Sequence, residues 1–163
     1  MQEEAGGIAD ALALTERFVG IDRAVVLLGD NVFERSIAPH VDAFRLQREG
    51  ARVLLKEVGD PERYGVAALD EHQVVSIEEK PSNPASNFAV VGCYMYDHRL
   101  YGLIRQIERS ARGELEITAV NNLYVQLGLL QYGVVEGRWT DAGTFDSLLE
   151  ANQLLLATGN QVQ

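Results

Sequence analysis

The 163-residue sequence has few basic side chains, a single cysteine and no long apolar run. Its 14 Lys and Arg are outnumbered by 24 Asp and Glu, and the net charge of -10 argues against a nucleic acid or an anionic membrane as partner. Cys93 cannot form a disulfide within the chain, and no stretch reads as a signal peptide or a membrane span. These absences favour a cytoplasmic protein, and the length fits one domain over residues 1–163.

What is present is a regular alternation of helical and strand patterns. Helices are predicted over 7–20, 36–50, 98–110, 113–128 and from 144 onward, and strands over 24–28, 51–58, 87–97 and 129–137. A β-hairpin is predicted around Asp70–Gln73. This order predicts an α/β fold with an open, mostly parallel twisted sheet, helices on both faces and the hairpin inserted. Ligands of such sheets bind beyond the carboxyl ends of the parallel strands.

Two aspartates follow strands, where a ligand is expected. Asp30 comes just after the strand 24–28, whose five apolar residues predict burial on both faces. Asp141 lies in the turn "WTDAGT", after a strand and before the last helix. Two carboxylates from distant strand ends can together hold one Mg²⁺, which prefers a couple of carboxylates plus substrate phosphate oxygens. The alternative for each aspartate is an ordinary helix N-cap, and both alternatives stay open on position alone.

Cationic and small residues accompany these acids. Lys80 comes directly off a strand in "SIEEKP", where it either reaches a phosphate as a point charge or belongs to an exposed charged run. Arg112 precedes a helix predicted to begin at Glu114, and the N-terminus of a helix suits an anion. Gly65 would let a ligand approach the backbone closely. Trp139 is either a core residue or one wall of the same cleft.

Taken in order, these motifs resemble the sugar-1-phosphate nucleotidylyltransferases, and among them the glucose-1-phosphate thymidylyltransferases. The matching stretches are "GGIADAL", "LGDN", "DPERYGV", "IEEKP", "NFAVVGCYMYD", "SARGELEIT" and "WTDAGT", and they span nearly the whole chain. The resemblance implies the nucleotide-diphospho-sugar transferase type of α/β fold. It also implies the transfer of a nucleotidyl group from a nucleoside triphosphate, here dTTP, to glucose 1-phosphate, with release of pyrophosphate.

The resemblance assigns a role to individual residues of this sequence. Asp30 and Asp141 would bind Mg²⁺, and Lys80 and Arg112 would hold the phosphate of the sugar. The residues implied to line the sugar pocket are Asn31, Gly65, Glu79, Val90 and Tyr94, with Trp139 near it. Gln2 and Gly7 fall where the family reads the nucleobase.

One departure from the family pattern is prominent. The family begins with a glycine-rich segment, Gly-Gly-x-Gly-Thr-Arg-Leu, whose amides and cations bind the triphosphate, and no such segment occurs here. We therefore expect an N-terminally truncated form that is inactive or very weak alone, because removing even one such donor costs about 10²–10³ in rate. The alternatives are a non-catalytic module that binds a sugar phosphate or nucleotide sugar, and an assembly subunit. A homo-oligomer is also expected, formed through an exposed strand edge and through Leu148, Leu149 and Leu155.

Overall fold

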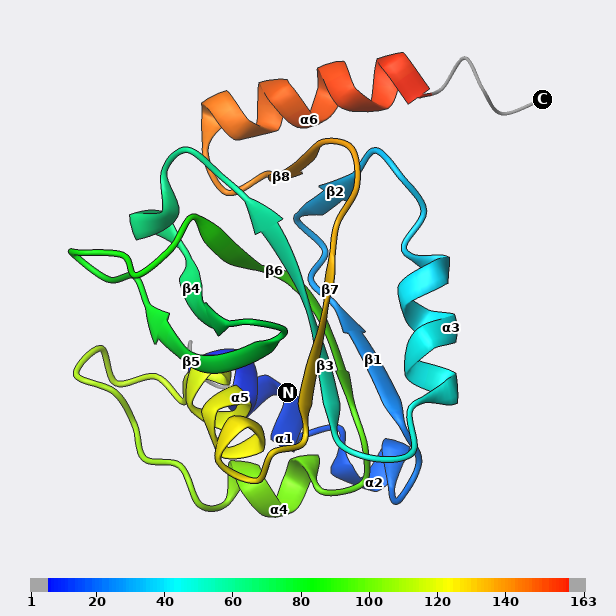
Figure 1. Cartoon of the computed structure of the whole chain (residues 1–163), viewed down its shortest axis with the longest axis vertical. Coiled ribbons are helices and arrows are strands. Elements are labelled where there is room, and N and C mark those ends of the chain that lie inside the picture. Colours follow the sequence, from blue (N-terminus) through cyan, green and yellow to red (C-terminus); the bar gives the residue numbers. More distant parts are fainter. Residues whose placement is uncertain (1–5, 159–163) are drawn as a thin grey trace.

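The computed structural model describes residues 6–158, which form a mixed sheet with helices on both faces (Figure 1). The main sheet contains β1 (Ala24–Leu27), β3 (Ala51–Glu57), β4 (Gly65–Asp70), β5 (Gln73–Glu79), β6 (Phe88–Tyr96) and β7 (Leu130–Val134). A small second sheet pairs β2 (Asn31–Phe33) with β8 (Trp139–Asp141). The helices are α1 (Ile8–Ala13), α2 (Glu16–Val19), α3 (Ala38–Leu46), α4 (Leu100–Ile104), α5 (Ile117–Gln126) and α6 (Phe145–Thr158), with a 3₁₀ turn at Pro61–Arg63.

The α/β class is confirmed, but the sheet is mixed and not mostly parallel. The strand order is β5-β4-β6-β3-β7, with β1 paired to β6. Among the strand pairs formed within residues 6–158, only β3 and β7 are parallel. β1 and β3 run in the same direction, but β6 lies between them and runs in the opposite one. The chain reaches β6 from the hairpin through a short loop, so no crossover helix forces a parallel strand there.

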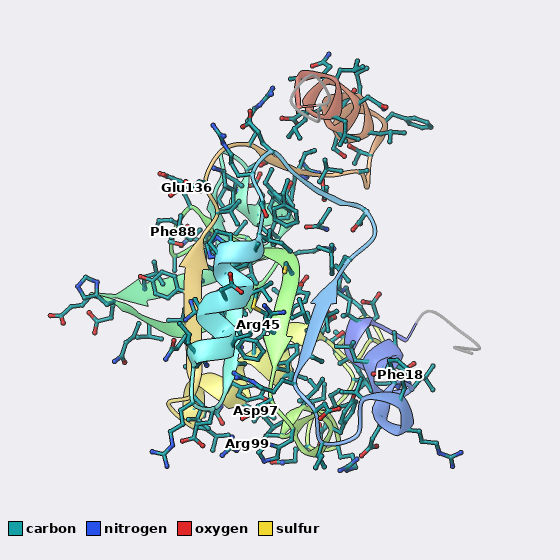
Figure 2. The ribbon with its side chains drawn as sticks, turned by 90° about the vertical axis from the view of Figure 1, so that its right-hand side faces the viewer. Phe18, Arg45, Phe88, Asp97, Arg99 and Glu136 are labelled. Atoms are coloured by element: carbon teal, nitrogen blue, oxygen red, sulfur yellow. The ribbon has the colours of Figure 1, made fainter. Side chains whose placement is uncertain are left out.

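Apolar side chains on alternate positions of the strands build a core on each face of the sheet. In β3, Leu54 faces α3 and packs with Phe44, whereas Val53 and Leu55 face the opposite side, which α1, α4 and α5 cover. α3 lies alone against its face, as Figure 2 shows by placing it in front of the strands. Helices on both faces are thus confirmed.

Several predicted elements differ from the observed ones. The helix predicted over 7–20 is divided into α1 and α2, although Gly20, at a φ of 62°, ends the segment as expected. β1 was predicted to be buried on both faces, and this is wrong: Val25 is 46% exposed and Leu27 is 52% exposed. β1 pairs with β6 along one edge and takes no strand partner from residues 6–158 on the other. The strands β2 and β8 were not predicted.

A buried carboxylate, Asp97, fixes the C-terminal end of β6. Asp97 accepts hydrogen bonds from the backbone N–H groups of Gly50 (2.7 Å) and Arg99 (3.0 Å) and from the Tyr124 hydroxyl (3.0 Å), and it forms an ion pair with the Arg99 guanidinium. Asp97 and Arg99 lie together at the lower end of the sheet in Figure 2. Burial alone would raise the pKa of Asp97, but these hydrogen bonds outweigh burial and hold it below its ordinary value.

The two edges of β6 explain where the sheet opens. β3 follows one edge of β6, while β1 pairs with the other edge at Leu27–Cys93 and β4 pairs with it at Val66–Ala89. β1 and β4 therefore separate around Val90, and side chains and loops from other elements surround the gap. No helix within residues 6–158 is long and apolar enough to cross a bilayer.

Candidate active site

A cavity of about 320 Å³ lies where β1 and β4 separate. Its volume is within the range of small-molecule binding sites. It is lined by Ile8, Leu28, Asp30, Asn31, Arg63, Tyr64, Gly65, Glu79, Lys80, Val90, Gly92, Tyr94, Arg112, Glu114, Glu116, Ile117, Thr118, Asn121, Trp139 and Asp141. The fold thus brings together residues that are separated by more than a hundred positions in the sequence.

The small sheet formed by β2 and β8 places the two aspartates next to each other. Asn31 is paired with Asp141 in this sheet, and the Ala142 N–H donates to the Asp30 carbonyl at 2.8 Å. Neither aspartate is a helix cap. Asp30 is followed by a strand, and α6 is capped by Thr144, whose hydroxyl accepts from the Ser147 N–H at 3.1 Å.

Asn31 connects the parts of this edge of the cavity. Its Oδ1 accepts from the Gly92 N–H and from Nε1–H of Trp139, both at 2.8 Å, and its Nδ2 donates to Oδ1 of Asp30 at 2.8 Å. A Cβ on Gly92 would lie only 2.5 Å from Nδ2 of Asn31, so the bare glycine makes room for this amide. One side chain therefore orients a carboxylate, holds an indole and ties both to β6.

The residues at this edge suit a Mg²⁺ ion. Oδ1 of Asp141 is buried without a hydrogen-bond partner, and the guanidinium of Arg63 is 3.6 Å away. No group of three or more His, Cys, Asp or Glu side chains suited to a metal occurs in the part of the chain that the structure describes. Two carboxylates fit an ion that takes its remaining ligands from substrate phosphates and water, and Oδ1 of Asp141, which accepts no hydrogen bond and only faces Arg63 at 3.6 Å, can serve as one of its ligands.

Lys80 enters the cavity from a left-handed backbone conformation. Its φ is 47°, which costs a non-glycine residue about 1 kcal/mol. Its N–H donates to the Tyr64 carbonyl at 2.9 Å, which holds the turn after β5 in place. The Lys80 side chain is exposed and forms no ion pair with residues 6–158, so its ammonium is available to an anion in the cavity.

Arg112 also lines the cavity, but unlike Lys80 it is already paired with carboxylates. The helix predicted to begin at Glu114 begins at Ile117, because a turn that includes Gly113, at a φ of 78°, and an irregular segment over 114–116 precede it, and Arg112 is therefore not at a helix N-terminus. Its guanidinium donates to Glu116 at 2.9 Å and lies 3.6 Å from carboxylate oxygens of Glu79 and Glu114. The hydrogen bond to Glu116 raises the pKa of Arg112 further. Its position is fixed, and a bound anion would compete with these carboxylates.

The wall opposite the aspartates combines β4, β5 and the first turn of α5. The Thr118 hydroxyl donates to Oε2 of Glu79 at 2.6 Å. A Cβ on Gly65 would lie 3.3 Å from both of these oxygen atoms, so this glycine leaves them accessible. Tyr94 stacks against Tyr96 behind the wall, with ring centroids 6.3 Å apart.

Most of the residues that the sequence assigned to a substrate or metal site line this cavity, with two exceptions. Gln2 is outside the described residues. Gly7 does not line the cavity, although its neighbour Ile8 does. Both alternatives for Trp139 hold: it is 9% exposed and packs in the core cluster with Phe44 and Leu54, and it also lines the cavity. Its ring meets that of Tyr64 edge to face at 5.4 Å.

Sequence reasoning missed several lining residues, whose roles depend on contacts between distant segments. They are Arg63, Tyr64, Gly92, Glu114, Glu116, Thr118 and Asn121. For two of them the sequence did carry a signal: Thr118 and Asn121 are three positions apart, and this spacing places two polar side chains on one face of α5.

A larger cavity of about 580 Å³ lies between the tip of the β4–β5 hairpin and β7. It is lined by apolar residues, two glutamines, two glycines, His72 and Tyr132, and no Asp, Glu, Lys or Arg is among its lining residues. Without convergent charged groups it offers little chemistry, and the smaller cavity is the stronger candidate.

Comparison with known proteins identifies the family. A family model described as nucleotidyl transferase matches residues 1–158. The chain belongs to the nucleotidyl transferase family. Glucose-1-phosphate thymidylyltransferases from Neisseria meningitidis and Streptomyces antibioticus are 39% and 41% identical to it. These alignments cover 98% and 92% of this chain, but 57% and 43% of the relatives.

Solved structures agree with the fold. The crystal structure of a candidate glucose-1-phosphate thymidylyltransferase from Bacillus anthracis, in complex with a sucrose, matches with a TM-score of 0.88 and 53% identity. The match covers 96% of this chain and 63% of that one. A UDP-glucose pyrophosphorylase with bound UDP-glucose matches with a TM-score of 0.83 at 21% identity, which shows a shared fold alone. The chain spans about half the length of the curated relatives it matches.

Proposed function

We propose that this nucleotidyl transferase acts on a sugar 1-phosphate, and that the cavity between β1 and β4 is where the sugar phosphate and Mg²⁺ bind. The proposal rests mainly on one observation, namely that Asp30, Asp141, Lys80 and Arg112 line the same cavity. The names of the similar proteins favour glucose 1-phosphate as the sugar substrate and dTTP as the nucleotide.

Each part of the cavity has a role in this proposal. Asp30 and Asp141 would hold Mg²⁺, with Asn31 fixing the Asp30 carboxylate. Lys80 and Arg112 would hold the phosphate of the sugar. The sugar itself would lie on the wall that includes Glu79 and Tyr94, as well as Gly65, Val90 and Trp139.

The reaction would join the two substrates by an in-line displacement. An oxygen of the sugar phosphate attacks the α-phosphorus of dTTP, the bond from that phosphorus to the β-bridging oxygen breaks, and pyrophosphate leaves. When bound, Mg²⁺ screens the phosphate charges. Lys80 and Arg112 orient the attacking phosphate, and Asn31 orients the Asp30 carboxylate, so these residues act by positioning and electrostatics.

The charges of the cavity favour a sugar phosphate over a triphosphate. Among the described residues that line it, carboxylates outnumber the cations Arg63, Lys80 and Arg112, and both arginines are already paired with carboxylates. One dianionic phosphate with Mg²⁺ suits this balance, whereas a triphosphate needs further cations. We therefore propose weak or absent turnover for this chain alone. A non-catalytic module that binds a sugar phosphate is the second candidate function, favoured by the same charge balance.

Binding and turnover can be measured separately. Trp139 is the only tryptophan of the chain and lines the cavity, so its fluorescence reports ligand binding directly. We expect glucose 1-phosphate with Mg²⁺ to change this fluorescence with saturation, and Asp141→Ala to abolish the dependence on Mg²⁺. Release of pyrophosphate from dTTP and glucose 1-phosphate then tests turnover. Saturable binding without turnover would favour the second candidate, and absence of both would contradict the proposed site.

Self-association is part of the proposal. Leu14, Phe18, Ile21, Val25 and Leu27 are exposed along the segment that runs from the end of α1 through α2 to β1, and Phe145, Leu148, Leu149 and Leu156 are exposed on α6. Phe18 extends away from the body of the molecule in Figure 2. Contact with a second copy would cover such apolar surface. Light scattering after size exclusion should show an oligomer, and a monomer at micromolar concentration would contradict this.

A further inference from the structure

Asn121 on α5 carries a buried polar group without a partner. The residue is 1% exposed and lines the candidate cavity. Its Oδ1 accepts from the Tyr96 hydroxyl at 2.6 Å, but its Nδ2 has no hydrogen-bond partner in the structure. A buried amide donor that stays unpaired is destabilising, and native proteins keep few of them.

The surroundings of Asn121 hold its amide in one orientation. Tyr96 is completely buried and stacks on Tyr94 and Tyr124, with ring centroids 6.3 and 5.7 Å away. Burial raises the pKa of Tyr96, so its hydroxyl keeps its proton and donates it to Oδ1 of Asn121. Since Oδ1 is engaged in this way, the two protons on Nδ2 remain for another acceptor.

No neighbouring side chain of the cavity wall supplies that acceptor. Thr118 lies one turn earlier on the same face of α5, and its hydroxyl proton goes to Glu79. Of the buried atoms without a hydrogen-bond partner, Nδ2 of Asn121 and Oδ1 of Asp141 both belong to residues that line the cavity. One is a donor and the other an acceptor, as expected of a site that is completed by a polar ligand.

We propose that Asn121 is a specificity-determining residue, whose Nδ2 donates a hydrogen bond to a hydroxyl oxygen of the bound sugar. This inference rests on the proposed function. The sugar end of the cavity carries Glu79 as an acceptor and Asn121 as a donor, and a hydroxyl group can satisfy both kinds of partner. Because a site built to bond a hydroxyl is left unpaired by an analogue without it, Asn121 discriminates against deoxy sugars.

The first test separates binding from stability. The double variant Asn121→Leu with Tyr96→Phe removes both polar partners, so it leaves no new unpaired group in the core. We expect a melting temperature equal to or above that of the unmodified chain, and an affinity for glucose 1-phosphate that is lower by about 10- to 100-fold.

Asn122 provides a matched control on the same helix. Both ends of its amide are paired with the backbone of Ile77, at 2.9 Å to the N–H and 2.7 Å to the carbonyl, and it does not line the cavity. Asn122→Leu should therefore lower the melting temperature and leave the affinity for glucose 1-phosphate unchanged. The opposite responses of two adjacent asparagines would distinguish a ligand contact from a structural one.

The second test identifies the hydroxyl by comparing the 2-, 3-, 4- and 6-deoxy forms of glucose 1-phosphate, with Trp139 fluorescence as readout. One deoxy form should bind the unmodified chain about 10-fold or more weakly, and the double variant should not make this distinction. An equal preference among the sugars in both proteins, or unchanged affinity in the double variant, would overturn the role of Asn121 while leaving the proposed function intact. Failure of the unmodified chain to bind glucose 1-phosphate at all would instead refute the proposed function, and this inference with it.

Discussion

Replacing Asn31 by alanine is the most informative single change at the cavity. The substitution removes the acceptor of the Gly92 N–H and of the Trp139 Nε1–H, each bonded at 2.8 Å. It also removes the donor to Asp30. Each donor left without an acceptor costs about 1–3 kcal/mol, and partial access to water places these two near the lower end. The expected loss of stability is therefore about 2–4 kcal/mol.

This loss should be visible in two measurements. A change of 1 kcal/mol shifts the melting temperature of a chain of this size by about 2–4 °C, so Asn31→Ala should melt about 5–15 °C lower. The emission of Trp139 should shift to the red, because its indole loses its fixed partner and becomes accessible to water. Thermal unfolding followed by Trp139 fluorescence gives both values from one sample.

Two further variants test whether the Asn31 amide holds this edge of the cavity. Gly92→Ala leaves Asn31 in the sequence but places a Cβ 2.5 Å from its Nδ2, so it should cause the same red shift by displacing the amide. Asn83→Ala, at an exposed loop position, should change neither measurement. A melting temperature and an emission maximum like those of the unmodified chain in Asn31→Ala would show that the amide does not hold this edge of the cavity.

Three other predictions test separate parts of the structure. Lys80→Gly should keep the melting temperature within a few degrees, because the left-handed backbone at this position suits glycine, but it should weaken glucose 1-phosphate binding by about 10-fold or more. The control is Glu71→Gly, which changes a residue at a φ of 51° in the hairpin turn and should leave binding unchanged. Asp97→Asn should cost about 3 kcal/mol at pH 7, measured by urea unfolding. Because the folded pKa of Asp97 lies below its unfolded value, this contribution is present above about pH 4 and is lost as the pH falls through the folded pKa, so the two unfolding curves should converge in acid. Cys93 is buried with its pKa raised to about 11, so at pH 8 it should react with a disulfide reagent more than about 100-fold more slowly in the folded chain than in denaturant.

Each of these has a result that would contradict it. Equal loss of binding in Lys80→Gly and Glu71→Gly would show that backbone change, and not the ammonium, matters. A difference between Asp97→Asn and the unmodified chain that does not shrink as the pH falls from 7 into acid would rule out the ionised carboxylate as its source. Rapid labelling of Cys93 without denaturant would show that the sheet opens readily in solution.

Local sequence determined most of the elements and the chemical type of the site. Short apolar runs and turn residues predicted β3, β6, β7 and the hairpin, and helical spacing predicted α3 and α5, because these patterns depend only on the order of side chains along one segment. The glycine, the carboxylates and the lysine after strand ends indicated an anion and metal site. The resemblance of "LGDN", "IEEKP" and "WTDAGT" to one family added candidate roles, and the family itself is now shown.

Only the tertiary structure decided how these groups meet. The antiparallel direction of β6, the exposed face of β1 and the pairing of β2 with β8 depend on which distant segment lies alongside, and no local pattern encodes that choice. The same holds for the unpaired amide of Asn121, which results from its bond to Tyr96 on another element. Residue types along the chain indicate which chemistry is available, but the partners that satisfy a polar atom, or leave it open to a ligand, are set by contacts across the fold.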